Sequence, residues 1–314
     1  MLSVVTPCYN EQACLAELHH RVSEACRRVT DDYEIVLVDD GSTDGTWAKL
    51  CELGEADPHV VAVRLSRNHG HQLALTAGLS ICRGQRVLIL DADLQDPPEL
   101  LAEMWARMDA GADVVYGQRR RREGDTVFKR ATARVFYAAI NWLSDTEIPP
   151  NTGDFRLISR RALDVLKDMP EQHRFIRGMV SWVGFTQQAV TYDRDPRFAG
   201  ETKYPLRKMV RLASDAIASF STKPLRLAGL LSFLTALVAV AVLVYVGISW
   251  LTGHTVSGWT SLMGGMALLS SVQLLVLALM GSYIGRMYEQ AKNRPLFIVQ
   301  DIRRAGRDPS GGAS

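Results

Sequence analysis

The sequence lacks the features that mark several large classes of protein. Its five cysteines all lie within the first 82 residues and form no C-x-x-C pair, which supports neither a zinc motif nor a disulfide framework and is typical of reduced thiols in the cytosol. The formal net charge is only +2, so nucleic acid is not an expected partner. No G-x-x-x-x-G-K-[ST] occurs, and no G-x-G-x-x-G follows the first apolar run, which excludes a P-loop and a dinucleotide-binding motif. Met1 leads directly into an apolar run without a basic segment, so no secretory signal is expected.

One long segment of the chain contains no acidic residue, lysine or arginine. The range Leu227–Gly285 has no Asp, Glu, Lys or Arg, and a polar, turn-rich patch at 251–258 divides it into two apolar halves. Each half is long enough to cross a hydrocarbon layer of roughly 30 Å as a helix of about 20 residues. A helical hairpin buried in a soluble core is the alternative, but soluble helices almost always carry a polar face. We therefore predict two transmembrane helices, at about 227–250 and 260–285.

Basic residues flank this segment on both sides. Lys223 and Arg226 precede the first helix, Arg286 follows the second, and the connecting loop has no Lys or Arg. Because positively charged flanks stay in the cytoplasm, we expect a multi-pass protein of the inner (cytoplasmic) membrane with both hydrophilic parts and both termini in the cytoplasm. The G-x-x-x-G at Gly281–Gly285 lets two helices approach closely, so we also expect a homo-oligomer.

Residues 1 to about 120 alternate short apolar runs with helical patterns. Apolar runs bounded by polar or Gly/Pro turns predict strands, and apolar residues at helical spacing predict helices. This alternation indicates an α/β fold with a parallel sheet covered on both faces. The predicted strands are Leu2–Thr6, Glu34–Asp39, Val60–Leu65, Arg86–Leu90 and Asp113–Gly117, and the predicted helices are Ala13–Val29, Thr43–Ala56, Gln72–Cys82 and Pro98–Ala110.

Polar clusters follow the predicted strands, at the edge where parallel sheets bind ligands. Asp91 and Asp93 come directly after an apolar strand, and Asp39-Asp40 ends a neighbouring one. Two carboxylates, with water and phosphate oxygens, form an octahedral oxygen site for Mg²⁺ or Mn²⁺. Such an ion neutralises the charge that develops on a departing diphosphate. The alternative for one of these carboxylates is to cap the next helix, which Asp96 could do instead.

Four segments stand out in order along the chain: VVTPCYNE, VLVDDGSTDGT, LILDADLQDPPE and NTGDFRLISRRAL. They resemble family 2 of the inverting glycosyltransferases, and more narrowly its polyprenyl-phosphate sugar synthases. That group includes dolichol-phosphate mannose synthase and the bacterial enzymes that glucosylate undecaprenyl phosphate. The resemblance covers nearly the whole chain, including the paired apolar helices. It implies a GT-A fold, which is a Rossmann-like parallel or mixed sheet that binds a nucleotide sugar.

The resemblance also implies roles for the matching positions. Asp91, Asp93 and Gln95 correspond to the metal and diphosphate site, and Asp93 and Asp154 are the implied catalytic residues. From the residues alone, Tyr9 could equally be a packed aromatic and Asp39 or Asp40 a turn-former. The implied nucleotide-sugar pocket is Pro7, Tyr9, Asn10, Glu11, Asp39, Asp40, His69, Gly70, Asp91, Ala92 and Gln95, and the implied acceptor-phosphate group is Arg119, Arg122, Lys129, Arg197 and Lys203.

Asp154 raises a question of mechanism, because this position is the one usually offered as a catalytic base in the family. The acceptor would be a lipid monophosphate, whose second pKa of about 6 leaves it largely ionised at neutral pH. Such a nucleophile needs little deprotonation. We therefore favour an orienting or electrostatic role for Asp154, with general-base catalysis as the alternative.

A further segment connects the α/β part to the membrane. Apolar residues within 203–222 fall mainly on one helical side, and basic residues lie beside them. This pattern is typical of a helix in the membrane interface, with an ordinary packing helix as the alternative. The predicted organisation is a catalytic domain at 1–202, a juxtamembrane amphipathic helix at 203–225, a membrane segment at 226–286 and a cytoplasmic tail at 287–314.

The resemblance implies a metal-dependent inverting hexosyltransferase that acts on undecaprenyl or another polyprenyl phosphate at the cytoplasmic membrane face. UDP-glucose is the favoured donor because 151–156 looks most like the glucosyl branch. GDP-mannose, a UDP-N-acetylhexosamine and a UDP-aminoarabinose are the alternatives. A processive polysaccharide synthase is disfavoured because no Q-x-x-R-W occurs. A membrane protein that only binds lipid or nucleotide sugar has no need for Asp91, Asp93 and Asp154 together.

Overall fold

A computed structural model of the chain describes residues 1–120, 149, 151–193, 223–252 and 258–304. The described residues fall into two compact units, which are treated separately below. The first unit contains all the strands and the helices that cover them. The second consists of two long helices, α9 (Lys223–Leu251) and α10 (Trp259–Ala291).

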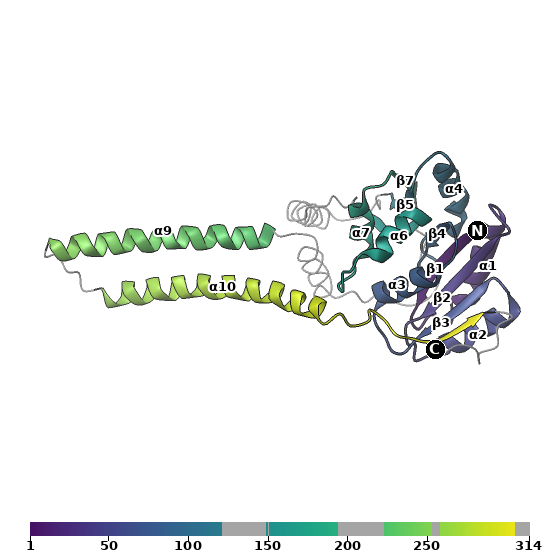
Figure 1. Cartoon of the computed structure of the whole chain (residues 1–314), viewed down its shortest axis with the longest axis horizontal. Helices are drawn as coiled ribbons and strands as arrows, with labels where there is room; N and C mark the ends of the chain where they lie inside the picture. Colours follow the sequence, from purple (N-terminus) through teal and green to yellow (C-terminus); the bar gives the residue numbers. More distant parts are fainter. Residues whose placement is uncertain (121–148, 150, 194–222, 253–257, 305–314) are drawn as a thin grey trace. The chain divides into compact units, whose positions relative to one another are not determined.

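The first unit is built on an eight-stranded sheet with the strand order β7-β5-β6-β4-β1-β2-β3-β8 (Figure 1). Strands β1 to β4 pair in parallel, as predicted, whereas β6 runs antiparallel between β4 and β5 and β8 runs antiparallel beside β3. The sheet is therefore mixed, within the α/β class that the sequence predicted. The strands are β1 (Leu2–Cys8), β2 (Tyr33–Asp39), β3 (Val60–Leu65), β4 (Arg86–Ile89), β5 (Val114–Arg119), β6 (Thr152–Ser159), β7 (Gln187–Tyr192) and β8 (Val299–Arg304).

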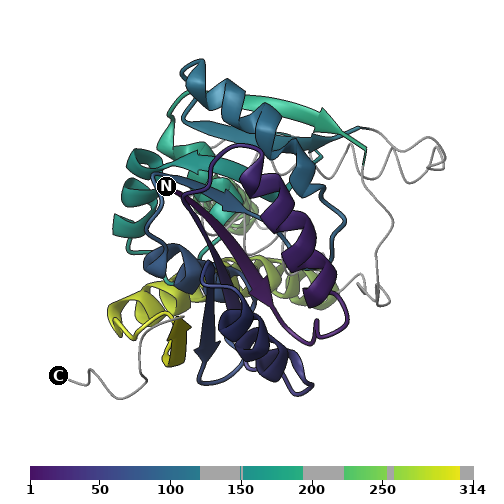
Figure 2. The same ribbon diagram turned by 90° about the vertical axis from the view of Figure 1, so that its right-hand side faces the viewer.

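Helices cover both faces of this sheet, an arrangement that can also be followed in Figure 2. Alternate residues of a strand point to opposite faces, and Val4 and Leu37 join the cluster formed with α1, α2 and α4. On the other face α3 packs so closely that a Cβ at Gly78 would lie 2.4 Å from Cγ1 of Val5. The covering helices are α1 (Leu15–Arg27), α2 (Thr46–Ala56), α3 (His71–Ile81), η1 with α4 (Pro98–Leu100, Leu101–Asp109), α6 (Arg160–Asp168) and α7 (Ile176–Val183).

Three strands, β6, β7 and β8, were not predicted from the sequence. The segment around Asp154 was interpreted as a motif with no assigned secondary structure, but it forms β6, whose first seven residues are buried. The range 287–314 was predicted as a cytoplasmic tail with no strand assigned to it. Instead, 299–304 forms β8 and belongs to the first unit. The sheet therefore takes one edge strand from a segment that follows the apolar helices.

Phe155 anchors β6 in the core and offers a test of this packing. Its side chain is fully buried, and its ring meets that of Tyr192 edge to face, with 5.8 Å between centroids. We expect Phe155→Ala to lower the free energy of unfolding by about 3–5 kcal/mol, because it removes a large apolar group and leaves a cavity. Denaturant unfolding of the purified chain, followed by tryptophan fluorescence, measures this change.

Val165→Ala is the matched control, because Val165 on α6 is 40% exposed. We expect it to change the free energy of unfolding by less than about 0.5 kcal/mol. A cost for Phe155→Ala as small as that of the control would contradict the placement of β6 in the core.

The two helices of the second unit are long and apolar enough to cross a membrane. Their most apolar windows are Ala228–Tyr245, with a mean hydropathy of 2.4, and Leu268–Ala291, with 1.7. Almost none of these side chains is buried within the protein. The predicted pair of candidate transmembrane helices is thus confirmed in number and approximate position.

Candidate active site

The candidate site lies at the carboxyl edge of the parallel strands. Asp39 ends β2 opposite Cys8 of β1, and Asp91 follows β4 by two residues. Strand β6 runs in the opposite direction, with Arg156 opposite Ile89. Asp154, two residues before Arg156, therefore lies beyond the end of β4, beside Asp91. Topology alone thus brings carboxylates from three strands to one edge.

Asp40 fixes the loop that follows β3. Its carboxylate accepts hydrogen bonds from the backbone N–H groups of His69, at 2.7 Å, and Gly70, at 2.9 Å. Burial raises the pKa of Asp40, although the two backbone hydrogen bonds oppose that rise. Gly41 has a φ of +68°, and a Cβ there would lie 2.6 Å from the carbonyl carbon of Arg67. The structure thus brings three predicted residues, Asp40, His69 and Gly70, into contact.

The segment after β1 is tied to the loop after β2. The backbone N–H of Asn10 donates to Oγ of Ser42 at 3.0 Å, and Oδ1 of Asn10 accepts from the N–H of Thr43 at 2.9 Å. The N–H of Glu11 donates to Oγ1 of Thr46 at 2.9 Å. These bonds place the predicted pocket residues on two adjoining loops. Among the others, Pro7 is buried in β1, Tyr9 is 46% exposed, and Asp39 is fully buried with its Oδ1 accepting from the N–H of Ser42.

Asp91 and Asp93 occupy the turn after β4. Oδ1 of Asp91 is buried and has no hydrogen-bond donor. Burial raises the pKa of Asp91 to about 6, with His71 opposing the rise and Asp154 adding to it. Oδ1 of Asp93 accepts from the N–H of Gln95 at 3.2 Å, and Ala92 and Gln95 are buried in the same turn.

These residues fit a divalent metal that is shared with a ligand. An unsatisfied carboxylate oxygen on Asp91, beside a second carboxylate on Asp93, is a suitable pair of hard oxygen donors for Mg²⁺ or Mn²⁺. Within the described ranges no three His, Cys, Asp or Glu side chains gather as a complete set of ligands. Water and the oxygens of a bound diphosphate would supply the remaining positions, as magnesium sites usually require.

Asp154 is buried among donors and cations. Its Oδ2 accepts a hydrogen bond from Nε2 of Gln72 at 2.8 Å and lies 3.4 Å from Nε2 of His71. Its Oδ1 lies 3.5 Å from Nη2 of Arg177. Burial favours the neutral acid, but the interaction with His71 and the charges of Arg177 and Arg156 outweigh it and hold the pKa of Asp154 well below its usual range. The carboxyl group is therefore ionised.

His71 links the two acidic parts of the site. Its Nε2 lies 3.5 Å from Oδ1 of Asp91 and 3.4 Å from Oδ2 of Asp154. Partial burial disfavours the charged ring, but the neighbouring carboxylates of Asp154 and Asp91 outweigh it and raise the pKa of His71 to about 9. A positive charge between these two acids offsets their mutual repulsion.

Arg119 was expected at the acceptor phosphate, and the structure gives it an internal partner. Its Nη2 lies 3.2 Å from Oδ1 of the fully buried Asp96, and its Nε donates to the hydroxyl of Tyr192 at 3.1 Å. That hydroxyl also hydrogen bonds to Asp96. Arg119 therefore neutralises a buried carboxylate. The other predicted cations, Arg122, Lys129, Arg197 and Lys203, lie outside the described residues, as does most of the predicted helix at 203–225.

Three residues of the site were given no role from the sequence: His71, Gln72 and Arg177. The first two begin α3, shortly after the predicted strand Val60–Leu65, and that position at a strand's carboxyl end was an available signal. No local pattern points to Arg177, which reaches Asp154 from α7 across 23 residues of chain.

Comparison with known proteins gives consistent matches. The model of glycosyl transferase family 2 matches residues 3–166. The chain is 45% identical to the uncharacterized glycosyltransferase YkcC of Bacillus subtilis (strain 168), over 95% of this chain and 93% of the relative. It is 37% identical to the bactoprenol glucosyl transferase of Shigella phage SfII, over 96% of this chain and 98% of that enzyme.

Among solved structures, mannosyl-3-phosphoglycerate synthase from Rubrobacter xylanophilus aligns over 73% of this chain and 75% of its own. Its identity is 20% and its TM-score 0.48, which is too distant to carry an inference. The family match covers β1 to α6 and so includes every carboxylate described above, and the two relatives extend it across the apolar helices. This chain belongs to glycosyltransferase family 2.

Proposed function

We propose that this protein transfers glucose from UDP-glucose, with inversion, to undecaprenyl or another polyprenyl phosphate at the cytoplasmic face of the membrane. The observation that carries the proposal is the 37% identity to a bactoprenol glucosyl transferase over 98% of that enzyme. A match of that extent includes the site and both candidate membrane helices. The products are the polyprenyl-phosphate sugar and UDP.

The donor pocket is assigned to the loops after β1, β2 and β3. Asp40 clamps the loop at His69 and Gly70, and Asn10 joins the first two loops. Such cross-linked loops form a rigid surface for a nucleoside, and we assign Pro7, Tyr9, Glu11 and Asp39 to the same pocket. This assignment supports a nucleotide-sugar donor, for which GDP-mannose, a UDP-N-acetylhexosamine and a UDP-aminoarabinose are the alternatives to UDP-glucose.

Asp91 and Asp93, with Gln95 beside them, are the residues that would hold Mg²⁺ or Mn²⁺. When bound, the ion would neutralise charge on the leaving diphosphate. An ionised phosphate oxygen of the acceptor attacks the anomeric carbon and forms the new C–O bond, while the bond to the diphosphate breaks and its electron pair leaves with UDP. A single displacement of this kind inverts the anomeric centre.

The role proposed for Asp154 is to orient and stabilise charge in this displacement. A carboxyl group with a pKa held well below its usual range is a weak base. The dianionic acceptor phosphate, with a second pKa of about 6, needs no strong base at neutral pH. We assign the binding of the acceptor phosphate to the basic residues Arg122, Lys129, Arg197 and Lys203. Arg119 pairs with the buried carboxylate of Asp96.

The membrane arrangement of the proposal has both apolar helices spanning the inner membrane and the catalytic unit in the cytoplasm. It is supported by the basic flanks Lys223, Arg226 and Arg286 and by the two apolar windows. The lipid acceptor would then meet the enzyme at the membrane surface. We also propose a homo-oligomer formed through Gly281 and Gly285.

One incubation tests the proposed function. Purified full-length protein is mixed with undecaprenyl phosphate, Mn²⁺ and each of the four radiolabelled nucleotide sugars in turn. We expect label from UDP-glucose to move into the lipid phase, and we expect chelation by EDTA to stop the transfer. If label moved from a different nucleotide sugar, that sugar would take the place of glucose in the proposal. If no nucleotide sugar gave transfer, the proposal would be rejected.

A further inference from the structure

The side chain of Gln72 joins Asp154 to the start of α7. Its Nε2 donates to Oδ2 of Asp154 at 2.8 Å, and its Oε1 accepts from the backbone N–H of Ile176 at 2.8 Å. Gln72 lies in the first turn of α3, whereas Asp154 belongs to β6 and Ile176 is the first residue of α7. One amide group thus connects three elements that are distant in the sequence.

The amide of Gln72 satisfies both of these partners with one group. Glutamine carries a donor and an acceptor at the end of one side chain. Glutamate could accept from Ile176 but would place a second negative charge against Asp154. Methionine fills a similar volume and makes neither hydrogen bond. The chemistry of the two partners therefore explains why glutamine suits this position.

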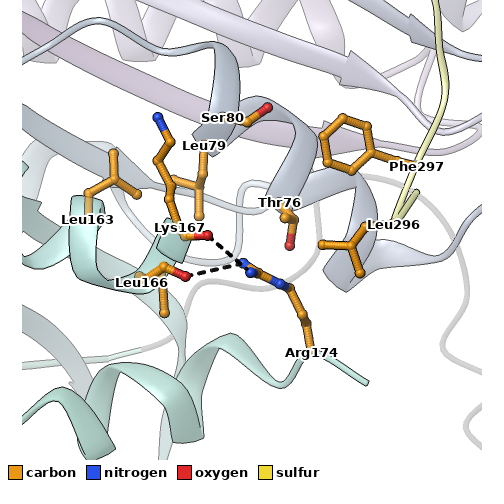
Figure 3. A pocket seen from close by; sticks show the side chains of 9 residues that line it. All are labelled: Thr76, Leu79, Ser80, Leu163, Leu166, Lys167, Arg174, Leu296 and Phe297. Atoms are coloured by element: carbon orange, nitrogen blue, oxygen red, sulfur yellow. Dashed lines mark hydrogen bonds between the residues drawn. The ribbon is translucent and has the colours of Figure 1, made fainter. Parts of the chain in front are cut away.

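The connection between α6 and α7 is also held from its other side, by Arg174. Its Nη1 donates to the carbonyl of Leu166 at 3.3 Å and its Nη2 to the carbonyl of Lys167 at 3.5 Å, in the last turn of α6 (Figure 3). Arg174 also lines a cavity of about 140 Å³ that Phe297 borders from the segment before β8. Arg174 and Ile176 are only two residues apart, so the entry into α7 is fixed at two points.

Fixing this entry matters because the next residue reaches the site. Arg177 follows Ile176 in the first turn of α7, and its Nη2 lies 3.5 Å from Oδ1 of Asp154. Gln72 therefore acts on the position of Asp154 in two ways. It holds one carboxylate oxygen directly, and it holds the helix turn whose arginine faces the other oxygen.

We propose that Gln72 is a positioning residue for sugar transfer, which orients the carboxylate of Asp154 and keeps Arg177 beside it by anchoring α7. This inference rests on the proposed function, since it assigns a role within that reaction. It predicts that loss of the amide impairs the chemical step, whereas donor binding, which we assign to the loops after β1 to β3, is unaffected.

The test uses the full-length enzyme and three variants. Gln72→Met keeps the volume and removes both hydrogen bonds, and Gln72→Glu keeps only the bond to Ile176. Gln187→Met is the matched control, because Nε2 of Gln187 donates to the carbonyl of Val180, near the other end of α7, at 2.9 Å. We expect both Gln72 variants to lower kcat by about 10- to 100-fold, as loss of a supporting hydrogen bond does at other sites. We expect KM for UDP-glucose to stay within about twofold, and the control to keep its kcat.

Amide hydrogen exchange at Ile176 gives a readout that does not depend on turnover. We expect it to accelerate in Gln72→Met and to stay unchanged in the Gln187→Met control, with similar thermal midpoints. If the wild type transfers no sugar at all, the proposed function fails while this exchange still tests the anchoring of α7. Wild-type kcat in Gln72→Met, or unchanged exchange at Ile176, would overturn the inference.

Discussion

Asp93→Ala is expected to reduce sugar transfer by at least about 1,000-fold, the scale seen when a group that stabilises developing charge is removed. Asp91 and Asp93 are the two carboxylates that we assign to the metal, so the loss of Asp93 leaves Asp91 alone to hold it. The diphosphate would then depart without compensation for its charge. Radiolabel transfer measures turnover, and electron paramagnetic resonance of bound Mn²⁺ measures the site itself. We expect both signals to fall together.

Asp164→Ala is the matched control for this change. Asp164 is an exposed carboxylate on α6, and its Oδ1 lies 3.7 Å from Nη1 of Arg160 on the same helix. We expect it to leave transfer and Mn²⁺ binding intact, while circular dichroism shows both variants to be folded. Turnover by Asp93→Ala within about tenfold of the wild type would reject the metal assignment.

Asp154→Asn is expected to lower kcat by about 100- to 10,000-fold, because it removes a buried negative charge from the site. The asparagine keeps the shape of the side chain. However, it leaves Arg177 and the buried Arg156 without their counter-charge. It also replaces one of the two acceptor oxygens of the carboxylate with an NH₂ group, which cannot accept a hydrogen bond. Single-turnover transfer, measured with the donor in excess, separates this loss from any change in donor affinity.

The pH dependence of Asp154→Asn distinguishes the two roles considered for this residue. A general base would be needed only while the acceptor phosphate keeps its second proton, below a pH of about 6. If Asp154 acts as a base, raising the pH to about 9 should therefore restore the variant. If it acts electrostatically, as we propose, the loss persists at high pH. Asp113→Asn, which removes another buried carboxylate paired with Arg161, should lower stability and leave kcat unchanged.

The sequence predicted the parallel half of the sheet well because its signals are local. The predicted range Val60–Leu65 agrees with β3 at both ends, and the other four predicted strands agree within two residues. Each is a short apolar run closed by a turn, which is the pattern expected of a strand buried on both faces. The same logic placed Asp91 and Asp93 at the functional edge.

β6 escaped prediction because its sequence contradicts strand propensity. It carries Gly153, Asp154 and Arg156 in the interior of the sheet, where glycine and charged residues are disfavoured. Its charges are tolerated because Asp154 has partners on α3 and α7, and because Arg156 donates hydrogen bonds to the backbone carbonyls of Gly153 and Asp154. Sequence rules often fail in this way where a protein keeps polar groups for function.

The partners of Asp154 could not be found from sequence for a different reason. Gln72 is separated from it by 82 residues and donates from a helix on the face opposite α1. Contacts of that separation depend on the whole topology, and no spacing rule encodes them. The same holds for β8, whose register with β3 joins Val61 to Arg304 across most of the chain.

The position of β8 has a practical consequence for making a water-soluble fragment. Strands β7 and β8 form the two opposite borders of the sheet, and the apolar helices lie between them in the chain. In the chain, the apolar helices are thus an insertion between two strands of the sheet and not an appendage at its end. A stop codon before α9 would strip a border strand and leave β3 open to pairing with other molecules. A linker that replaces 223–294 and retains 295–304 would keep this border strand.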